Sequence, residues 1–463
     1  MKMWSGRFSQ ELNATFEQWQ RSFPFDRILV PYEVAASKAH AAALAKAGVL
    51  TNAELALTHQ GLDQIAAEGI PADEDPTIED VHHYVEKRLV EVAGEVGFKL
   101  HTGRSRNEQI ATDLRLYVRT QIDAVSLVLV ELATEFVNQA EKAGETAMPS
   151  YTHLQRAEPV LVAHWLLAYF EMIVRDLGRL ADCRKRLNAC PLGSAAVAGT
   201  ILPLDRAAMA KALDFDAPTA NSIDATSDRD FAIEFVQALA QVAMHLSRWA
   251  EEFILFATTE YGFVKLPEAF STGSSAMPQK KNPDVLELVR GKAARVFGDA
   301  TTLFVAIKGL PLAYDKDMQE TQEPVFSAAQ QVGSMARMAT GFMASVTFDY
   351  TRMQAASGGF MNALAGAAYL VRNGVPFRIA HEIIGKAVQL GVEKGCELEQ
   401  LSGEDFASCG ISADSQFYSA LQLQQVLAIH DVPGGTAPLQ VRAALKKAKD
   451  TLSRYAGAAH VCA

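Results

Sequence analysis

The sequence predicts an all-α protein built around a long central bundle of helices. Apolar residues recur at helical spacing over four long stretches, at about 112–142, 158–188, 228–260 and 284–308. Convincing strand alternation is scarce, and helix breakers fall between the stretches, among them Pro149, Pro191, Pro218 and Pro278. Helices of this length are typical of a bundle.

The regions on either side of the bundle predict smaller domains. Residues 1–111 have the pattern of short helices and loops, residues 112–360 form the central bundle, and residues 361–463 form a smaller helical domain. Two turns interrupt the last domain, at Gly374-Val375-Pro376 and Pro433-Gly434-Gly435. The apolar residues of the long helices cover more than one stripe, so we expect subunit association in a symmetric oligomer as well as an internal core.

Composition excludes several classes of function. The chain of 463 residues is 49% hydrophobic with a net charge of −11, which indicates a globular protein and argues against a general nucleic-acid or membrane binder. None of its five cysteines forms a CxxC pair, and no phosphate-binding glycine motif is present, so we expect no metal and no nucleotide cofactor. The most apolar run, 160–170, contains His164 and is too short for a membrane span. The beginning of the sequence lacks an apolar signal core, and we expect a cytoplasmic protein.

Three polar segments interrupt the apolar pattern, each shortly before a long helix. The first is His101–Gln109, the second is Ser150–Pro159 and the third is Ser271–Asp284. A helix N-terminus offers free backbone N–H groups and a positive dipole end, which suit an anion. The sequence therefore predicts that these segments take part in binding a negatively charged ligand.

The first two segments carry residue types that bind carboxylates and transfer protons. Arg104, Arg106, Asn107 and Ser105 suit a carboxylate, although a polar helix start with Ser105 or Asn107 as a cap explains them equally well. In the second segment, His153 beside Thr152 is well matched to proton transfer near neutral pH. The alternative is a structural histidine.

The third segment crowds Ser274 and Lys280 into one glycine-containing loop. A serine acts as a base only with a nearby cation, backbone N–H donors and exclusion of water. The alternative is a surface loop followed by a helix with Pro283 in its first turn. Glu287, in the following helix, could orient His153, although an exposed helix glutamate is the simpler interpretation.

Several quoted runs together resemble one enzyme family. The run GSSAMPQKKNP resembles the signature loop of the fumarase/aspartase superfamily. With HTGRSRNEQ, YTHLQRAEP, GLPLAYDKDMQE and the initial MWSGRF, the chain resembles the argininosuccinate lyase family over nearly its whole length. The resemblance implies an all-α subunit of three domains, no cofactor, and a homotetramer in which the three polar segments of different subunits form each active site. The implied reaction is the reversible β-elimination of argininosuccinate to arginine and fumarate in arginine biosynthesis.

The resemblance also implies roles for particular residues. Ser274 and His153 would be the proton-transfer pair, with Ser274 favoured as the base, His153 as the acid, and the opposite assignment left open. Glu287 would stand behind His153, and Lys280 would stabilise negative charge. Substrate-binding positions would be Ser22, Ser105, Arg106, Asn107, Thr152, Asn282, Tyr314 and Gln319. The chain departs from the family at Gln322, where the family has a lysine that contacts the amino-acid end of the substrate.

Other functions are weighed against this reaction. One is the elimination of fumarate from a different succinyl-amine substrate. Another is a structural role without catalysis, as in lens delta-crystallin, for which the retained polar residues have no physical need. A metal-dependent hydrolase lacks support because His82 and His83 are adjacent and match neither HxxxH nor HExxH; they are better explained as part of a helix near the pocket.

Overall fold

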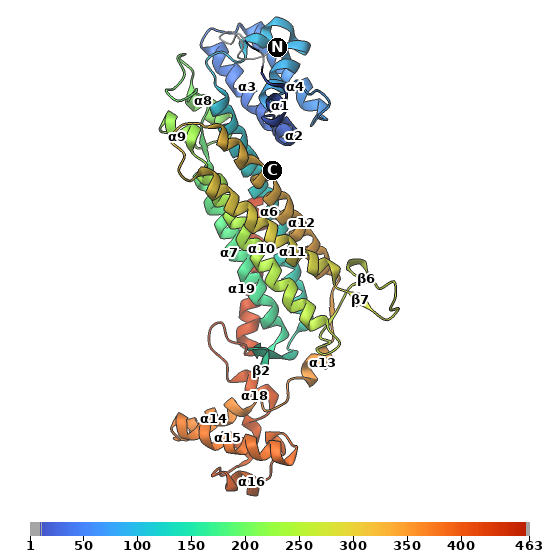
Figure 1. The fold of residues 1–463 in the computed structure, drawn as a ribbon. Coiled ribbons are helices and arrows are strands. Elements are labelled where there is room, and N and C mark those ends of the chain that lie inside the picture. Colours follow the sequence, from blue (N-terminus) through green and yellow to red (C-terminus); the bar gives the residue numbers. More distant parts are fainter. Residues whose placement is uncertain (1–9, 11, 460–463) are drawn as a thin grey trace. The chain divides into compact units, whose positions relative to one another are not determined.

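The computed structural model describes residues 10 and 12–459, and the initial MWSGRF lies outside these. The predicted all-α class is confirmed, because five long helices dominate the chain (Figure 1). They are α6 (Arg106–Ala143), α7 (Val162–Leu187), α10 (Asp230–Ala257), α11 (Asp284–Ile307) and α12 (Gln322–Ser345). Four of them match the predicted stretches. The stretch predicted from residue 158 becomes helical only at Val162, because the residues before it form a strand.

The chain divides into two compact units. Unit 1 comprises residues 1–126, 176–243 and 292–333, and unit 2 comprises residues 127–175, 244–291 and 334–463. Each long helix contributes one end to unit 1 and the other end to unit 2. The division into three domains expected from the sequence uses other boundaries and stays a prediction.

In unit 1, three helices pack beside the helix ends. These are α3 (Val30–Lys46), α4 (Asn52–Glu68) and α5 (Val81–Ala93), and α4 begins at a reciprocal cap between Thr51 and Glu54. Tyr117 of α6 lies edge-on to Phe326 of α12, with ring centroids 4.9 Å apart. The shorter elements are α1 (Ala14–Trp19), α2 (Phe23–Asp26), η1 (Arg27–Leu29), η2 (Gly94–Lys99), α8 (Arg206–Ala212), α9 (Ser222–Ser227), η4 (Lys316–Thr321) and the parallel pair β3 (Ala189–Cys190) and β4 (Ala217–Pro218).

In unit 2, aromatic side chains join the other ends of the same helices. Trp165 of α7 stacks on Phe253 of α10 at 5.2 Å, and Trp249 of α10 meets Phe342 of α12 edge-on at 5.5 Å. These rings supply large buried apolar surfaces at the centre of the bundle. The shorter elements here are the antiparallel pairs β1 (Ala147–Thr152) with β2 (Gln155–Leu161), β5 (Val264–Lys265) with β8 (Thr347–Phe348) and β6 (Thr272–Gly273) with β7 (Lys281–Asn282), and also η3 (Glu268–Phe270) and α13 (Tyr350–Ala355).

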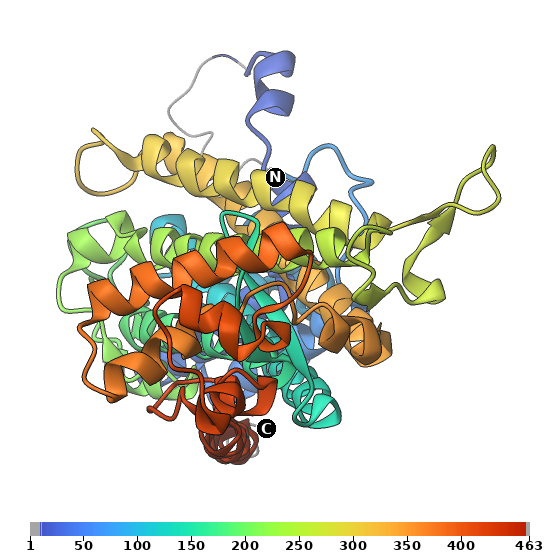
Figure 2. The ribbon, with the colours of Figure 1, turned by 90° about the horizontal axis from the view of Figure 1, so that it is seen from below.

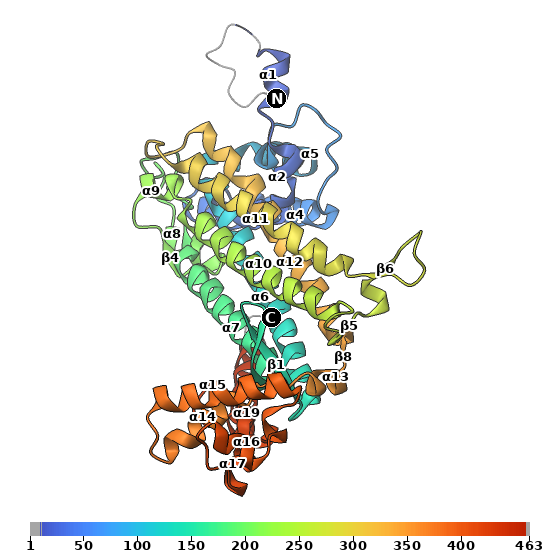
Figure 3. The same cartoon turned by 60° about the horizontal axis from the view of Figure 1, so that its bottom comes forward.

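The last part of unit 2 consists of shorter helices. Figure 3 shows α14 (Ala363–Arg372) and α15 (Phe377–Lys394) lying side by side. Both predicted turns are confirmed, because Gly374 and Gly434 have φ angles of 93° and 83°, which glycine adopts without strain. The remaining helices are η5 (Leu398–Gln400), α16 (Gly403–Ser408), α17 (Ser415–Ala420), α18 (Leu423–Ala428) and α19 (Pro438–Ala459). Among the described residues, no helix of either unit is long and apolar enough to cross a membrane.

Candidate active site

The first polar segment forms the N-terminal start of α6. The Ser105 hydroxyl accepts a hydrogen bond from the backbone N–H of Asn107 at 3.3 Å, and Glu108 accepts from the backbone N–H of Ser105 at 3.1 Å. The second oxygen of Glu108 accepts from the N–H of Ala195 at 2.9 Å, and the amide of Asn107 donates to the carbonyl of Ala196 at 3.3 Å. Ser105 therefore caps the helix, and Glu108 ties its first turn to the 195–196 loop.

Arg106 points to a pair of acidic residues. Its guanidinium lies 3.0 Å from the carboxylate of Asp80 and 3.6 Å from that of Glu79. Glu79 also contacts Lys316 at 3.7 Å, and its backbone carbonyl accepts from the N–H of Ser22 at 3.0 Å. The structure thus gathers Ser22 and Arg106 around the Glu79–Asp80 pair, which the sequence analysis did not single out.

Two further predicted binding residues lie in the segment before α12. The amide of Gln319 donates to the carbonyl of Gln20 at 3.2 Å, two residues from Ser22. Tyr314 is half-buried, and burial raises the pKa of its phenol to about 12, while the charge of Arg229 opposes that rise. Ser22, Tyr314 and Gln319 therefore belong to one polar region of unit 1 together with Arg106.

Arg229 is a cation that sequence reasoning missed. It is 1% exposed, and its Nη1 donates to the carbonyl of Asp228 at 2.7 Å, whereas its Nε and Nη2 find no hydrogen-bond partner among the described residues. Burial lowers the pKa of this guanidinium to about 10. No motif marks Arg229 in the sequence, because a single arginine at a helix start is common. Its proximity to Tyr314 is a product of the fold.

The second polar segment is the β1–β2 hairpin, which differs from the expected loop before a helix. Thr152 is the last residue of β1 and pairs with Gln155, so that His153 and Leu154 form the two-residue turn. Both turn residues have positive φ angles, 55° and 58°, as a tight hairpin turn requires. Such angles are unfavourable for side chains of this kind, and the hairpin must supply the stabilisation. Thr152 and His153 are both exposed.

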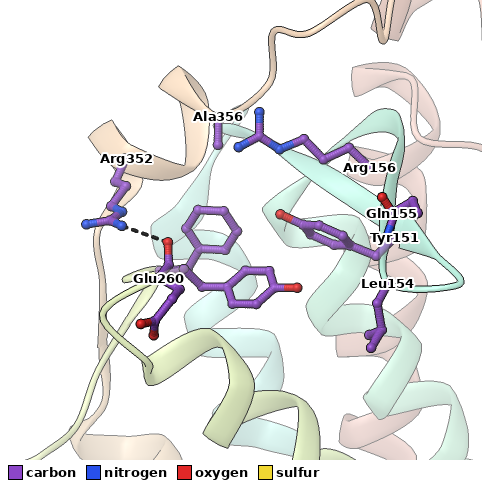
Figure 4. Close-up of a pocket in the computed structure, with 9 residues that line it drawn as sticks. Tyr151, Leu154, Gln155, Arg156, Glu260, Arg352 and Ala356 are labelled. Carbon is purple, nitrogen blue, oxygen red and sulfur yellow. Dashed lines mark hydrogen bonds between the residues drawn. The ribbon is translucent and has the colours of Figure 1, made fainter.

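A pocket of about 560 Å³ lies beside this hairpin (Figure 4). Tyr151 packs edge-on against Tyr261 with centroids 5.4 Å apart, and Arg352 donates to the carbonyl of Glu260 at 2.9 Å. The lining residues are Tyr151, Leu154, Gln155, Arg156, Glu260, Tyr261, Phe263, Arg352 and Ala356. None of the predicted catalytic or substrate-binding residues lines the pocket.

The third polar segment is the β6–β7 hairpin, which extends away from the helices of unit 2 (Figure 2). The hydroxyl oxygen of Ser274 accepts hydrogen bonds from the backbone N–H groups of Ala276 and Met277, at 3.2 Å and 3.0 Å. Two such donors stabilise a negative charge on that oxygen. Lys280 and Ser274 lie in the same loop, and the side chain of Lys280 is exposed.

The base of this hairpin is fixed by polar contacts with α11. Asp284, the first residue of α11, accepts from the N–H and the hydroxyl of Thr272 at 3.0 Å and 2.7 Å. The amide of Asn282 donates to the same hydroxyl at 3.4 Å. Glu287 lies in the first turn of α11 and is exposed. The hairpin therefore holds Asn282 near Thr272.

In unit 1, several predicted residues gather around Glu79 and Asp80. In unit 2, the predicted residues occupy two hairpins, one with the turn at His153 and the other with the loop at Ser274. Among the described residues, no hydrogen bond or ion pair joins the β1–β2 hairpin to the β6–β7 hairpin, and none joins Glu287 to His153. The expected contact between Glu287 and His153 is therefore not made within this chain.

The bundle of long helices with three polar segments defines a lyase of the fumarase/aspartase type, and the Lyase family matches residues 6–298. The family described as "Argininosuccinate lyase C-terminal" matches residues 360–428. The chain belongs to the argininosuccinate lyase family. The argininosuccinate lyase of Koribacter versatilis is 65% identical to it, with 100% of each chain covered. That of Acidobacterium capsulatum is 56% identical, over 96% of this chain and 94% of the relative.

Solved structures share the fold. An EDDS lyase variant with bound fumarate superposes with a TM-score of 0.85 at 26% identity, over 97% of this chain and 92% of that chain. A class II fumarase from Schistosoma mansoni gives a TM-score of 0.76 at 15% identity, over 89% and 94% of the two chains. The second likeness concerns the fold alone. Together they place the all-α architecture among the lyases of this superfamily.

Proposed function

We propose that this chain catalyses the reversible elimination of fumarate from argininosuccinate, which leaves arginine, with Ser274 and His153 as its proton-transfer residues. The observation that carries the proposal is the pair of backbone N–H groups on the Ser274 hydroxyl, in a member of this family. The base removes the proton on the carbon next to a substrate carboxylate, and the carboxylate becomes a doubly negative aci-carboxylate. The C–N bond then breaks, and the nitrogen leaves with a proton from the acid.

Negative charge grows during this reaction, and fixed donors therefore stabilise the intermediate more than the substrate. Lys280 and Asn282 in the hairpin of Ser274 supply a cation and an amide for the dianion. The N–H groups on Ser274 and the charge of Lys280 favour the alkoxide form of Ser274 once water is excluded. We assign His153 to the acid side, where an imidazolium donates a proton to the leaving nitrogen.

A carboxylate and an amino group of the substrate bind at the polar region of unit 1. Arg106, Tyr314 and Gln319 lie there with Ser22, and they offer a cation and several hydrogen-bond donors to a carboxylate and an amino group. Asn107 and Ser105 at the start of α6, and Thr152 beside His153, complete the set. Gln322 is 3% exposed, and its Oε1 has no hydrogen-bond partner among the described residues. Its amide is suited to contact the amino-acid end of the substrate without adding charge.

We further propose a homotetramer in which each active site combines residues of three subunits. Two exposed apolar side chains neighbour the catalytic residues, Leu154 at 65% and Met277 at 44% exposure. The helix α11 also exposes Leu288, Phe297, Phe304 and Val305. Apolar surface of this extent is typical of an interaction site. Association would bury it and bring His153 and Ser274 of different copies to one substrate. The four described cysteines are free thiols, which suits the cytoplasm.

The test is a subunit-mixing experiment with fumarate release followed by ultraviolet absorbance. Ser274→Ala and His153→Asn should each lower the turnover number at least about 100-fold while the oligomer stays intact. Mixing the two inactive proteins under conditions of subunit exchange should restore part of the activity. Turnover near that of the wild type in Ser274→Ala would refute its role, and no recovery after demonstrated exchange would refute shared sites.

A second candidate is the elimination of fumarate from another succinyl-amine. Gln322 favours this candidate, because the family has a lysine at this position and glutamine lacks its positive charge at the amino-acid end of the substrate site. A protein of similar fold, EDDS lyase, is named for a substrate other than argininosuccinate. Offering argininosuccinate and adenylosuccinate separately decides between the two, since release from argininosuccinate alone supports the first candidate.

A further inference from the structure

A network of buried polar side chains in unit 1 joins three helices. It contains Glu33 of α3, His82 of α5 and Asp113 of α6, together with Arg104, and none of the four is more than 8% exposed. His82 Nδ1 lies 2.8 Å from a Glu33 oxygen and 3.6 Å from an Asp113 oxygen. None of these four residues belongs to the proposed catalytic or binding set, so the network needs an explanation of its own.

Glu33 is the charged carboxylate of this network. One of its oxygens accepts from the hydroxyl of Ser37 at 2.6 Å and from the amide of Gln109 at 3.0 Å, and lies 3.5 Å from the Arg104 guanidinium. The other oxygen accepts from His82 Nδ1. Burial opposes ionisation, yet Arg104 and His82 hold the pKa of Glu33 well below its usual range. A carboxylate with this many donors is stable in a protein interior.

Asp113 is in the opposite situation. It is completely buried. If Asp113 were ionised, neither of its oxygens would receive a hydrogen bond from any described residue. One of its oxygens lies within 4.8 Å of an oxygen of Glu33, a second buried carboxylate. Two adjacent buried carboxylates cannot both be ionised cheaply, since one would be a buried charge without a donor. Burial and the charge of Glu33 raise the pKa of Asp113 well above its usual range.

We propose that Asp113 is a neutral carboxylic acid in the folded protein, that its O–H donates to Glu33, and that this shared proton positions the substrate-binding residues at the start of α6. Asp113 is thus a positioning residue, and this part of the inference rests on the proposed function of Arg106 and Asn107. Arg104 lies two residues before Arg106, and its Nη1 donates to Ser37 of α3 at 2.9 Å.

The same helices hold the partner of Arg106. His82 lies two residues after Asp80, whose carboxylate is 3.0 Å from Arg106 and also accepts from the N–H of His83 at 2.7 Å. A shift of α5 relative to α6 would therefore move Asp80 away from Arg106. The proposed proton would join α6 to α3. The hydrogen bond from His82 to Glu33 joins α5 to α3, and His82 also lies 3.6 Å from Asp113 of α6.

A metal ion is the competing occupant, because the ligand atoms of Glu33, His82 and Asp113 all lie within 4.8 Å of one another. The positive charge of Arg104, 3.5 Å from Glu33, opposes a divalent cation at this position. The oxygens of Glu33 are also already occupied by protein donors. A proton satisfies Asp113 without adding a second cation beside Arg104.

The titration of Asp113 takes place among other charged groups. The charged and titratable groups that act on Asp113 and Glu33 from the surrounding elements are Asp26, His40, His82, Glu86, His101 and Arg104. The sign for Asp113 follows from its raised folded pKa. Between the usual range of an aspartate and that raised pKa, the folded state holds a proton that the unfolded state has lost, so stability decreases as the pH rises.

The experiment compares the wild type with Asp113→Asn, in which an amide N–H replaces the acid O–H, and with Asp113→Leu, which has no donor. At one protein concentration, the ratio of the wild-type unfolding constant to that of Asp113→Asn should rise up to about tenfold per pH unit between about pH 5 and pH 7. A ratio that does not change with pH would overturn the proposal, since Asp113 would then be ionised throughout. Groups common to both proteins cancel in this ratio.

Two further measurements separate the alternatives. An infrared difference spectrum between the wild type and Asp113→Asn should contain the carbonyl band of a protonated carboxylic acid at neutral pH, and its absence would overturn the assignment. Elemental analysis of the purified wild type should find no stoichiometric metal; one equivalent that is lost in Asp113→Leu would replace the proton by a metal site.

The positioning role has its own readout. Asp113→Asn should keep the KM for argininosuccinate, whereas Asp113→Leu should raise it up to about tenfold, about the effect of one lost hydrogen bond to a charged group, with a smaller change in kcat. Equal KM values in both variants and the wild type would overturn the positioning role. If Asp113→Leu does not fold, Asp113→Ala, which also lacks a donor, provides the same comparison. The infrared band does not depend on activity, so a failure of the proposed function would leave the proton assignment testable.

Discussion

Glu108 offers the sharpest test of how the first polar segment is held. Its side chain is 0% exposed, and its two oxygens accept from the backbone N–H groups of Ser105 and Ala195 at 3.1 Å and 2.9 Å. We predict that Glu108→Ala destabilises the protein and weakens substrate binding, because both donors lose their acceptor and Asn107 loses its fixed distance to the 195–196 loop.

The magnitude follows from those two bonds. An unsatisfied buried donor costs about 1–3 kcal/mol, and both N–H groups belong to half-buried residues, so each loss lies near the lower end. Glu108→Ala should therefore lower the free energy of unfolding by about 2–3 kcal/mol. Glu108→Gln keeps one acceptor but turns an N–H donor toward the other backbone N–H, and should cost about 1–2 kcal/mol.

The assay is urea unfolding at one protein concentration, combined with the KM for argininosuccinate measured by fumarate release. Glu131→Ala is the matched control, because Glu131 is an exposed glutamate on the same helix. The wild type and Glu131→Ala should be the most stable, Glu108→Gln less stable and Glu108→Ala the least stable. KM should be lowest in the first two proteins and highest in Glu108→Ala. Unfolding free energies of both Glu108 variants equal to that of the control would refute the argument.

Three further predictions concern acid stability, specificity and assembly. Burial lowers the pKa of His40 to about 3 and that of His101 to about 4, so both stay neutral when folded and stability is lost as the pH falls below about 6.5. For His40 alone, unfolding should become easier by about 2 kcal/mol between about pH 7 and pH 5, as shown by urea midpoints. Gln322→Lys should lower the KM for argininosuccinate several-fold with kcat little changed, measured by fumarate release. Leu288→Arg on the exposed side of α11 should dissociate the oligomer, as measured by light scattering, and abolish activity.

Each of these predictions has a result that contradicts it. His40→Gln should lose most of the acid sensitivity that belongs to His40, and an unchanged slope of stability against pH would assign that sensitivity elsewhere. An unchanged KM in Gln322→Lys would mean that residue 322 does not approach the substrate carboxylate. A fully active tetramer of Leu288→Arg would show that this side of α11 lies outside the subunit interface.

The long helices could be predicted because their apolar spacing persists over many turns. In α10, Phe231, Phe235, Trp249 and Phe253 recur at helical spacing, and all four are buried. The start of α6 at Arg106, earlier than predicted, depends on two hydrogen bonds at its first turn. The Ser105 hydroxyl accepts from the N–H of Asn107, and Glu108 accepts from the N–H of Ser105.

The β1–β2 hairpin could not be predicted from its local sequence. A two-residue turn with positive φ angles usually carries glycine or asparagine, whereas this turn carries His153 and Leu154. Contacts from residues far away in the sequence hold it, since Tyr151 packs on Phe256 and Tyr261. The same limit applies to the site, where the acidic partners of Arg106 and the buried Arg229 are defined only by the folded chain.

The exposure of the proposed catalytic residues has a chemical consequence. A reaction that passes through a dianion gains most from fixed donors when water is excluded, because hydrogen bonds and charges act more strongly at low dielectric constant. In the single chain, His153 and the loop of Ser274 are exposed, and their exposed apolar neighbours Leu154 and Met277 lie beside them. The chain therefore carries the donors but not the enclosure. In the proposed tetramer, other copies would supply both the enclosure and the partner residues, so the proposal predicts that catalysis requires assembly.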